Sequence, residues 1–351
     1  MNRLFKVFAF VFLGLIVSNC KKDDNPTVKV DPPRDRQEVY KENIADIENY
    51  LQKNYMKFEN GILTLDSIQN NETSIWDQQD FPLQSITMKN EAWDLSVPFN
   101  NFTAGKDYTK ASYFKIKDSV DYKIYYLILN EGGGEKVQAI DSVFTTYRGY
   151  NLKNENFESN FNGMWSSYPK TIQEDKNIDL QRPAVNVLIP GFRQALSLIK
   201  TATGITDNGD GTNTFENAGR VVVFLPSGLA YFQSATGSIQ KYTPIIFDIE
   251  LINKFTRDHD LDGIPSILED LNGDGNYFND DTDGDGIPDF LDNDDDGDGF
   301  ITRQEISYIE KDEFGREFTK IYNFDEIPTC NGGKKRHLDA SCFPKPDGSW
   351  E

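Results

Sequence analysis

Apolar side chains follow a helical spacing near the beginning of the chain. Between residues 37 and 55 they recur every three or four positions, which predicts an amphipathic helix. We expect Gly61 to end this helix. The apolar positions are Tyr40, Ile44, Ile47 and Leu51. The helix could pair two copies of the chain into a homodimer, but it offers few heptad-like contacts, so we expect it to pack on its own domain.

Further along, apolar and polar residues alternate, as is typical of half-buried strands. The alternation is clear from Val120 to Ile128 and stops at a glycine-rich turn, residues 131–134. Three more strands are predicted at 137–150, 220–225 and 244–252, and one short helix at 192–201. Many strands with one short helix indicate an α+β fold, in which an antiparallel sheet packs on that helix. Residues 62–112 show no pattern that assigns them a fold.

The first residues resemble a bacterial export signal. Residues 1–19 combine basic residues with an apolar stretch that is too short for a comfortable membrane span. Ser18-Asn19-Cys20 resembles a lipoprotein cleavage site, so we expect a lipid on Cys20 and a polar tether over 20–36. Ordinary cleavage with loss of Cys20 is the alternative. These features place the protein in the bacterial cell envelope, as an outer-membrane lipoprotein that is either periplasmic or surface-exposed.

The two remaining cysteines fit an oxidising compartment. Cys330 and Cys342 lie in a tail, residues 306–351, that has little apolar content. A disulfide between them would close this tail. Two free thiols are the alternative, which an oxidising compartment disfavours.

Acidic residues dominate the charge of the chain. The formal net charge is −21, and sixteen acidic residues without a lysine or arginine lie between residues 258 and 299. This balance disfavours a nucleic-acid partner. Because the chain has only two histidines, a zinc site or a Ser-His-Asp triad lacks the necessary residues.

The acidic run repeats Asp-x-Asp-x-Asp-Gly, with Asn or Gly at some positions, from residues 258, 270, 281 and 294. It resembles thrombospondin type 3 repeats and EF-hand loops. Such loops offer Ca²⁺ the carboxylate and carbonyl oxygens that it prefers, with Gly at the sharp turn. We therefore expect residues 254–305 to bind structural Ca²⁺ and to become ordered only with it; a disordered acidic linker is the alternative. The expected ligands are Asp258, Asp260, Asp262, Glu269, Asp270, Asn272, Asp274, Asp281, Asp283, Asp285, Asp289, Asp292, Asp294, Asp296, Asp298, Thr302 and Glu305.

Five phrases in the middle of the chain resemble, in the same order, the FKBP family of peptidyl-prolyl isomerases. They are Val143–Tyr150, Phe157–Ser159, Leu188–Phe192, Leu225–Tyr231 and Ile245–Leu251. The resemblance implies an isomerase domain over 119–253, with a water-poor aromatic pocket for proline-containing polypeptides. Such a pocket needs no nucleophile and no catalytic cofactor, because it favours the twisted state of the X-Pro bond. The implied pocket residues are Tyr147, Phe157, Glu158, Leu188, Ile189, Phe192, Tyr231, Ile239 and Phe247.

The resemblance also assigns roles and departures. The amide of Ile189 and the hydroxyl of Tyr231 would hold carbonyl groups of the bound peptide. Phe192 stands where the family usually has Trp, Glu158 where it has Asp, and Phe232 where it has Gly. An insert at 204–219 could cover the pocket or alter its specificity.

The sequence therefore predicts an N-terminal helix with an unassigned region (37–118), the isomerase domain (119–253), the calcium-binding repeats (254–305) and the tail. The function that follows is peptidyl-prolyl isomerisation of exported proteins by an envelope-anchored protein. One alternative is a catalytically weak FKBP-fold lipoprotein that binds peptides or glycans. The other is a structural calcium-binding surface protein.

Overall fold

The computed structural model describes residues 32–90, 93–95, 113–167, 186–330 and 333–343. The predicted signal peptide, Cys20 and most of the predicted tether lie outside these residues. In the part of the chain that is described, no helix is long and apolar enough to cross a membrane.

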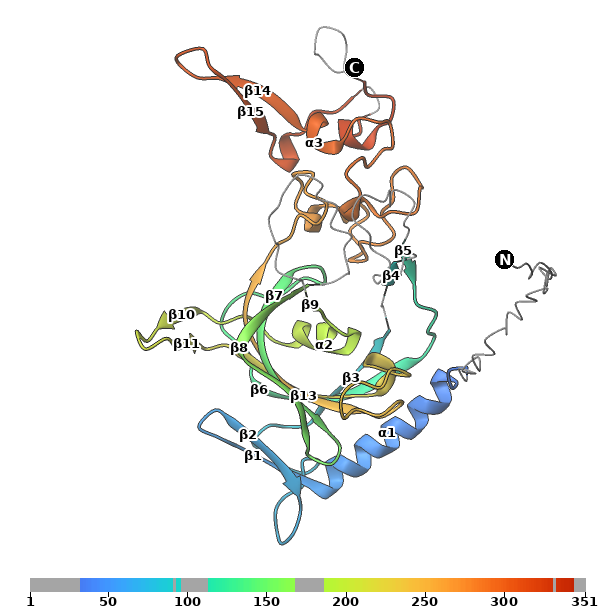
Figure 1. Ribbon diagram of the computed structural model, residues 1–351, viewed down its shortest axis with the longest axis vertical. Coiled ribbons are helices and arrows are strands. Elements are labelled where there is room, and N and C mark those ends of the chain that lie inside the picture. The colour runs from blue at the N-terminus through green and yellow to red at the C-terminus, as the bar shows by residue number, and fades with distance from the viewer. Residues whose placement is uncertain (1–31, 91–92, 96–112, 168–185, 331–332, 344–351) are drawn as a thin grey trace, which may run out of the picture. The chain divides into compact units, whose positions relative to one another are not determined.

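A mainly antiparallel sheet of seven strands is the largest element of the described residues (Figure 1). Its order is β3–β6–β12–β13–β7–β8–β9, and the pair β8–β9 is parallel. The strands are β3 (Gln84–Lys89), β6 (Asp121–Asn130), β7 (Ser142–Asn151), β8 (Asn156–Ser167), β9 (Asn186–Val187), β12 (Gly219–Leu225) and β13 (Ile245–Phe255). The sheet curves around helix α2 (Pro190–Ala195), as the α+β prediction required. The helix is shorter than the predicted 192–201, because a 3-10 turn at Leu196–Leu198 replaces its second half.

Both faces of this sheet are buried, which explains the unbroken apolar run of β12. Val221, Val223 and Leu225 join the core on the α2 side, whereas Val222 and Phe224 join a second core on the opposite side. Successive side chains of a strand point to opposite faces. A strand covered on both faces is therefore apolar throughout rather than alternating.

The second core is completed by the N-terminal region. Helix α1 (Arg36–Lys53) and the hairpin β1 (Asn54–Glu59)–β2 (Ile62–Ser67) bury Ile47, Leu51 and Leu65 against the sheet. The predicted helix is confirmed, and its apolar face is used within the chain. The prediction that Gly61 ends it was wrong, because the chain turns into β1 at Asn54. Asn60 and Gly61, with φ of 51° and 75°, instead form the turn of the hairpin.

Further segments form strands that the sequence prediction did not assign. Strand β3 pairs with β6 at the edge of the sheet, so the sheet includes a segment that lies before the expected boundary at residue 119. The insert 204–219 forms a hairpin of β10 (Gly204–Asp207) and β11 (Asn213–Glu216). A short pair of strands, β4 (Trp93–Leu95) and β5 (Tyr113–Lys115), lies between β3 and β6 in sequence.

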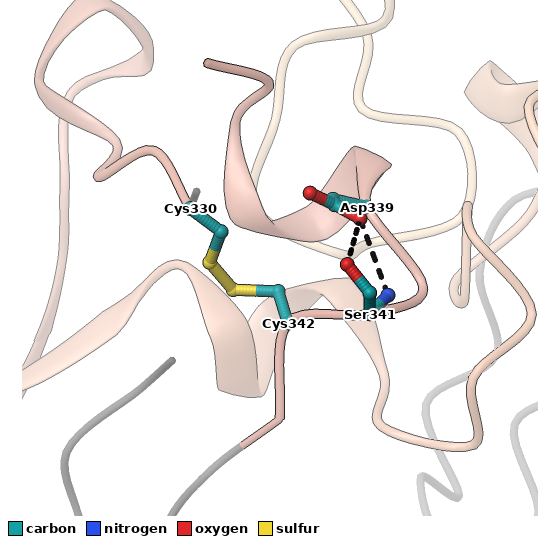
Figure 2. The surroundings of a disulfide bond; sticks show 4 residues. All are labelled: Cys330, Asp339, Ser341 and Cys342. Atoms are coloured by element: carbon teal, nitrogen blue, oxygen red, sulfur yellow. Dashed lines mark hydrogen bonds between the residues drawn. A yellow bond between two sulfur atoms is a disulfide. The ribbon is translucent and has the colours of Figure 1, made fainter. Parts of the chain in front are cut away.

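The acidic segment consists of loops and single turns, and it leads to helix α3 (Thr302–Glu305) and the hairpin β14 (Ser307–Lys311)–β15 (Glu317–Ile321). A small buried cluster of Ile264, Ile306 and Ile327 joins the first acidic loop to the tail. The predicted disulfide between Cys330 and Cys342 is present, with the two Cα atoms 6.0 Å apart (Figure 2). Next to it, the carboxylate of Asp339 accepts hydrogen bonds from the amide and hydroxyl of Ser341.

Candidate functional site

Four aromatic rings from four different elements meet on the α2 side of the sheet. Tyr147 lies on β7, Phe157 on β8, Phe192 on α2 and Phe247 on β13. We call this set the ring cluster. Its rings contact edge to face, with centroid distances of 5.2 Å for Phe192–Phe247, 5.5 Å for Tyr147–Phe192, 5.6 Å for Phe157–Phe247 and 5.7 Å for Tyr147–Phe247. The structure thus brings together residues that the FKBP resemblance implied.

The ring cluster has a closed base and an accessible rim. Phe192 and Phe247 are each only 3% exposed, whereas Tyr147 and Phe157 are half-buried. Other residues implied by the resemblance pack against the same core. They are the half-buried Leu188, Ile189 and Tyr231 and the buried Ile239.

A glycine makes room for one ring of the rim. Gly149 pairs with Phe247 on one side and with Glu158 on the other. A Cβ atom at Gly149 would lie 2.4 Å from Cζ of Phe157. The Phe157 ring can therefore lie on strand β7 only because residue 149 has no side chain.

Two tyrosine hydroxyls supply hydrogen-bond donors at the ring cluster. The hydroxyl of Tyr147 donates to Oε1 of Glu158 at 3.0 Å. Burial raises the pKa of Tyr147, and the carboxylate of Glu158 raises it further. The same two causes raise the pKa of Tyr231. Both hydroxyls therefore stay protonated at neutral pH. That of Tyr147 donates to Glu158, and that of Tyr231 can donate to a carbonyl group.

Phe232, where the FKBP resemblance implied a glycine, has a backbone conformation that favours glycine. Its φ is 45°, in the left-handed region that favours glycine. Its ring contacts Tyr242 edge to face at 5.0 Å, and the guanidinium of Arg36 lies 4.2 Å from the ring centroid. The large side chain at this turn is thus held by helix α1 and by the following loop.

The four acidic loops share one hydrogen-bonded skeleton. In each loop the amide of the glycine at position six donates to Oδ2 of the aspartate at position one, over 2.8–3.2 Å. The pairs are Gly263–Asp258, Gly275–Asp270, Gly286–Asp281 and Gly299–Asp294. All four glycines have positive φ, between 79° and 109°. The loops therefore adopt the register read from the sequence.

Among the described residues, carboxylates form groups of three whose ligand atoms lie within 4.8 Å of one another. Three groups are the odd positions of the first, third and fourth loops: Asp258, Asp260 and Asp262; Asp281, Asp283 and Asp285; Asp294, Asp296 and Asp298. In the second loop, amides lie among the acids: Asn272 donates to Asp280, and Asn279 donates to Asp274. A further group, Asp262, Glu269 and Asp295, combines the first and fourth loops.

Several of these carboxylates are buried without a hydrogen-bond donor. The residues that close the first and fourth loops, Glu269 and Glu305, are 3% and 0% exposed. Within the described parts of the chain, none of their four carboxylate oxygens has a donor. Burial and the neighbouring acids raise the pKa of Glu305 to about 9, and burial raises that of Asp262 to about 7. An isolated buried carboxylate is costly. These carboxylate oxygens therefore fit, as ligands, a hard cation with a preference for oxygen.

Three expected ligands at later positions of their loops also accept hydrogen bonds. Both carboxylate oxygens of Asp289 accept from Thr282, at 2.8 and 2.9 Å, and Oγ1 of Thr302 accepts from the amide of Asp295 at 3.3 Å. These position-nine residues brace their loops. Asp292 accepts from the amide of Asp294 at 3.0 Å, and burial raises its pKa to about 7.

Sequence reasoning missed Asp295, which is 2% exposed. It occupies the second position of the fourth loop, between the alternating residues that were expected to bind the cation. Its only signal in the sequence was the unbroken run from Asp294 to Asp296, because nothing in the spacing indicates which distant loop a second-position residue meets.

Comparison with solved structures finds several that are similar to part of the chain. One is a peptidyl-prolyl cis-trans isomerase from Pseudomonas syringae pv. tomato, at 22% identity and a TM-score of 0.27, covering 37% of this chain and 74% of that chain. Another is FkpA from Escherichia coli, at 19% identity and a TM-score of 0.27, covering 37% of this chain and 47% of that chain. A third is the N-terminal domain of FKBP42 from Arabidopsis thaliana, at 16% identity and a TM-score of 0.27, covering 38% of this chain and 86% of that chain.

Comparison at the level of sequence gives one result. A search of curated proteins found no match. Residues 259–337, which hold most of the four acidic loops and the hairpin β14–β15, match the family model described as BamM C-terminal.

Proposed function

We propose that the protein is a peptidyl-prolyl cis-trans isomerase of the cell envelope. The observation that carries this proposal is the ring cluster, in which Phe192 and Phe247 form a buried base under the accessible Tyr147 and Phe157. A proline ring is flat and apolar, and aromatic edges and faces of this kind suit it. The ordered phrases of the FKBP resemblance support the same activity.

Isomerisation at this site needs no covalent chemistry. Rotation about an X-Pro bond faces a barrier of about 18–20 kcal/mol that comes from amide resonance. In a water-poor site the twisted state, which has lost this resonance, is favoured relative to the planar state. The Tyr231 hydroxyl and the Ile189 amide would hold the neighbouring carbonyl groups of the peptide, while Glu158 fixes the Tyr147 ring through its hydroxyl.

We propose that this activity serves exported proteins at the outer membrane. Support comes from the lipoprotein-like Cys20 and from the match of residues 259–337 to the BamM C-terminal model, which favours association with outer-membrane assembly machinery. The lipid on Cys20 would anchor the protein, and proline-containing segments of unfolded clients would reach the ring cluster.

We propose further that the acidic loops bind calcium and that the ion orders this segment. The buried carboxylate oxygens without donors, on residues such as Asp260, Glu269 and Glu305, support this role. Binding and folding of such a segment share one free energy, so the loops would be ordered only when calcium is present.

The isomerase proposal is tested with the full-length protein and a short X-Pro peptide, by measuring cis-trans exchange with NMR. Tyr231→Phe, which keeps the ring and removes the hydroxyl, should slow exchange about tenfold, the usual scale for one hydrogen bond made in the transition state. The matched control is Tyr308→Phe, on β14, which should leave the rate unchanged.

A wild-type protein that does not accelerate exchange contradicts the proposal. If it binds the peptide without accelerating exchange, the peptide-binding alternative replaces catalysis. Equal rates for Tyr231→Phe and wild type would remove Tyr231 from the mechanism.

A further inference from the structure

One group of carboxylates joins the two ends of the acidic segment. Asp262 and Glu269 belong to the first loop and Asp295 to the fourth, yet their ligand oxygens lie within 4.8 Å of one another. The three residues are 1%, 3% and 2% exposed. Like charges this close repel strongly when they are buried.

Every residue of this group has at least one carboxylate oxygen without a donor in the described part of the chain. Oδ2 of Asp262, both carboxylate oxygens of Glu269 and Oδ1 of Asp295 are buried and have no hydrogen-bond partner among the described residues. Three buried carboxylates that lie close together therefore each carry an oxygen that accepts no hydrogen bond from the residues described. A positively charged occupant would satisfy these oxygens, because a buried acceptor without a partner is destabilising.

The first and fourth loops also contact each other outside this group. Nη1 of Arg303, just after the fourth loop's turn, donates to the carbonyl oxygen of Leu261 in the first loop at 3.2 Å. Ile264 of the first loop packs with Ile306, which follows the fourth loop, and both are buried. The meeting of Asp295 with Glu269 is thus part of a contact between the two loops.

We infer that Asp295 is a ligand, supplied by the fourth loop, of the calcium ion held by the first loop, so that one ion clamps the two ends of the segment together. This inference rests on the proposed calcium binding. Asp262 belongs both to this group and to the group of Asp258 and Asp260, so a single ion could contact the first loop and Asp295 at once. A carboxylate pair from loops that are distant in sequence restrains the chain much as a covalent cross-link does.

The test is hydrogen exchange of the full-length protein at increasing calcium concentration, followed by mass spectrometry. In the wild type, peptides from residues 258–269 and 294–305 should gain protection at the same calcium concentration. In Asp295→Asn, the midpoint for 258–269 should rise about tenfold, because ligand charge sets the affinity of such loops. The two midpoints should then separate. Peptides from β13 report whether the rest of the chain stays folded.

The matched control is Asp285→Asn, which removes an exposed carboxylate of the third loop. It should weaken binding by the third loop and leave the midpoints of the first and fourth loops coincident. A second variant, Asp295→Glu, keeps the carboxylate and should have a calcium affinity between those of Asp295→Asn and the wild type. It serves as the test if Asp295→Asn folds poorly.

The outcomes separate the two proposals. If calcium protects the loops but Asp295→Asn and Asp295→Glu both match the wild type, the clamp is wrong and calcium binding stands. If the midpoints of the two loops already differ tenfold in the wild type, the clamp is also wrong. If calcium changes protection nowhere in the wild type, both the clamp and the proposed calcium binding fail.

Discussion

The guanidinium of Arg36 lies 4.2 Å from the centre of the Phe232 ring, so the first turn of α1 contacts the turn that carries Tyr231. Nη1 of Arg36 also pairs at 2.9 Å with Asp118, whose side chain is fully buried. A buried carboxylate is costly without its partner. Arg36 therefore joins the N-terminal helix both to Asp118, which precedes β6, and to the turn beside the candidate site.

Replacing Arg36 should destabilise the chain and loosen the Tyr231 turn. Asp118 would keep hydrogen bonds from Tyr122 and Asn90, so we expect Arg36→Ala to cost about 2 kcal/mol in the free energy of unfolding, less than the full loss of a buried pair. Urea denaturation measures this change. Arg36→Lys, which keeps the charge, should cost less; equal losses for the two variants would show that the charge is unimportant.

Adding one methyl group at Gly149 should disable the ring cluster. The new Cβ would overlap the Phe157 ring, so Gly149→Ala should displace that ring, reduce the isomerisation rate about tenfold or more, and cost about 1–3 kcal/mol of stability from overpacking. NMR exchange of an X-Pro peptide measures the rate. The control is Gly204→Ala on β10, whose Cβ would meet only the flexible end of Glu216 at 3.2 Å. An unchanged rate in Gly149→Ala would contradict the role of Phe157.

Acidity should act on the acidic loops in opposite directions with and without calcium. Burial and neighbouring acids raise the pKa of Asp295 to about 10 and that of Glu305 to about 9, far above about 4 in an unfolded chain. Without calcium, the folded loops therefore bind more protons than the unfolded loops between about pH 4 and about pH 9–10. The contribution of these two carboxyl groups to the stability of the loops is full below about pH 4 and is lost as the pH rises through about 9–10.

With calcium the ligands are deprotonated, so affinity should rise with pH. Hydrogen exchange of residues 258–305 at pH 5.5 and pH 7.5, with calcium or with a chelator, checks both signs. A chelated protein that is more protected at pH 7.5 than at pH 5.5 would contradict the first, and calcium affinity that falls with rising pH would contradict the second.

Opening the disulfide should destabilise the tail. Cys330 and Cys342 are separated by 12 residues in sequence, and closing a loop near this size contributes about 3 kcal/mol in the chain-entropy account. Exchange of Cys330→Ser/Cys342→Ser should become faster in peptides covering residues 321–343 and stay unchanged in β13. Wild-type protein with a reductant serves as the control and should behave in the same way. Unchanged exchange in the tail would mean that packing of residues such as Ile327 suffices.

Local patterns predicted the parts of the fold in which one face of an element is buried. The helical spacing of Ile47 and Leu51 indicated α1, and alternation or apolar runs indicated β6, β7, β12 and β13, because burial imposes these periods. The hairpin β1–β2 was missed although Asn60-Gly61 is a strong turn signal between apolar residues. Strand β3 was missed because its side chains are mostly exposed, which leaves no apolar period in its sequence.

The candidate site was predictable to the extent that it resembles a known arrangement. The four rings of the ring cluster were named from ordered phrases, since spacing alone does not indicate that the Phe157 ring of β8 contacts the Phe247 ring of β13. The expected loop ligands were named from the repeat, because each loop is local in sequence. The contact of Asp295 with Glu269 depends on how two whole loops pack, and no local pattern encodes it.

The two-sided sheet has a consequence for the order in which the polypeptide can fold. Helix α1 emerges first, but the surface it covers includes Val222, Phe224 and Ile246, which are synthesised some 170 residues or more after Leu51. Until β13 is complete, the apolar face of α1 has only part of its partners, such as Leu63 and Leu65 of the hairpin β1–β2. The N-terminal helix can therefore complete its packing only when nearly the whole sheet has been made.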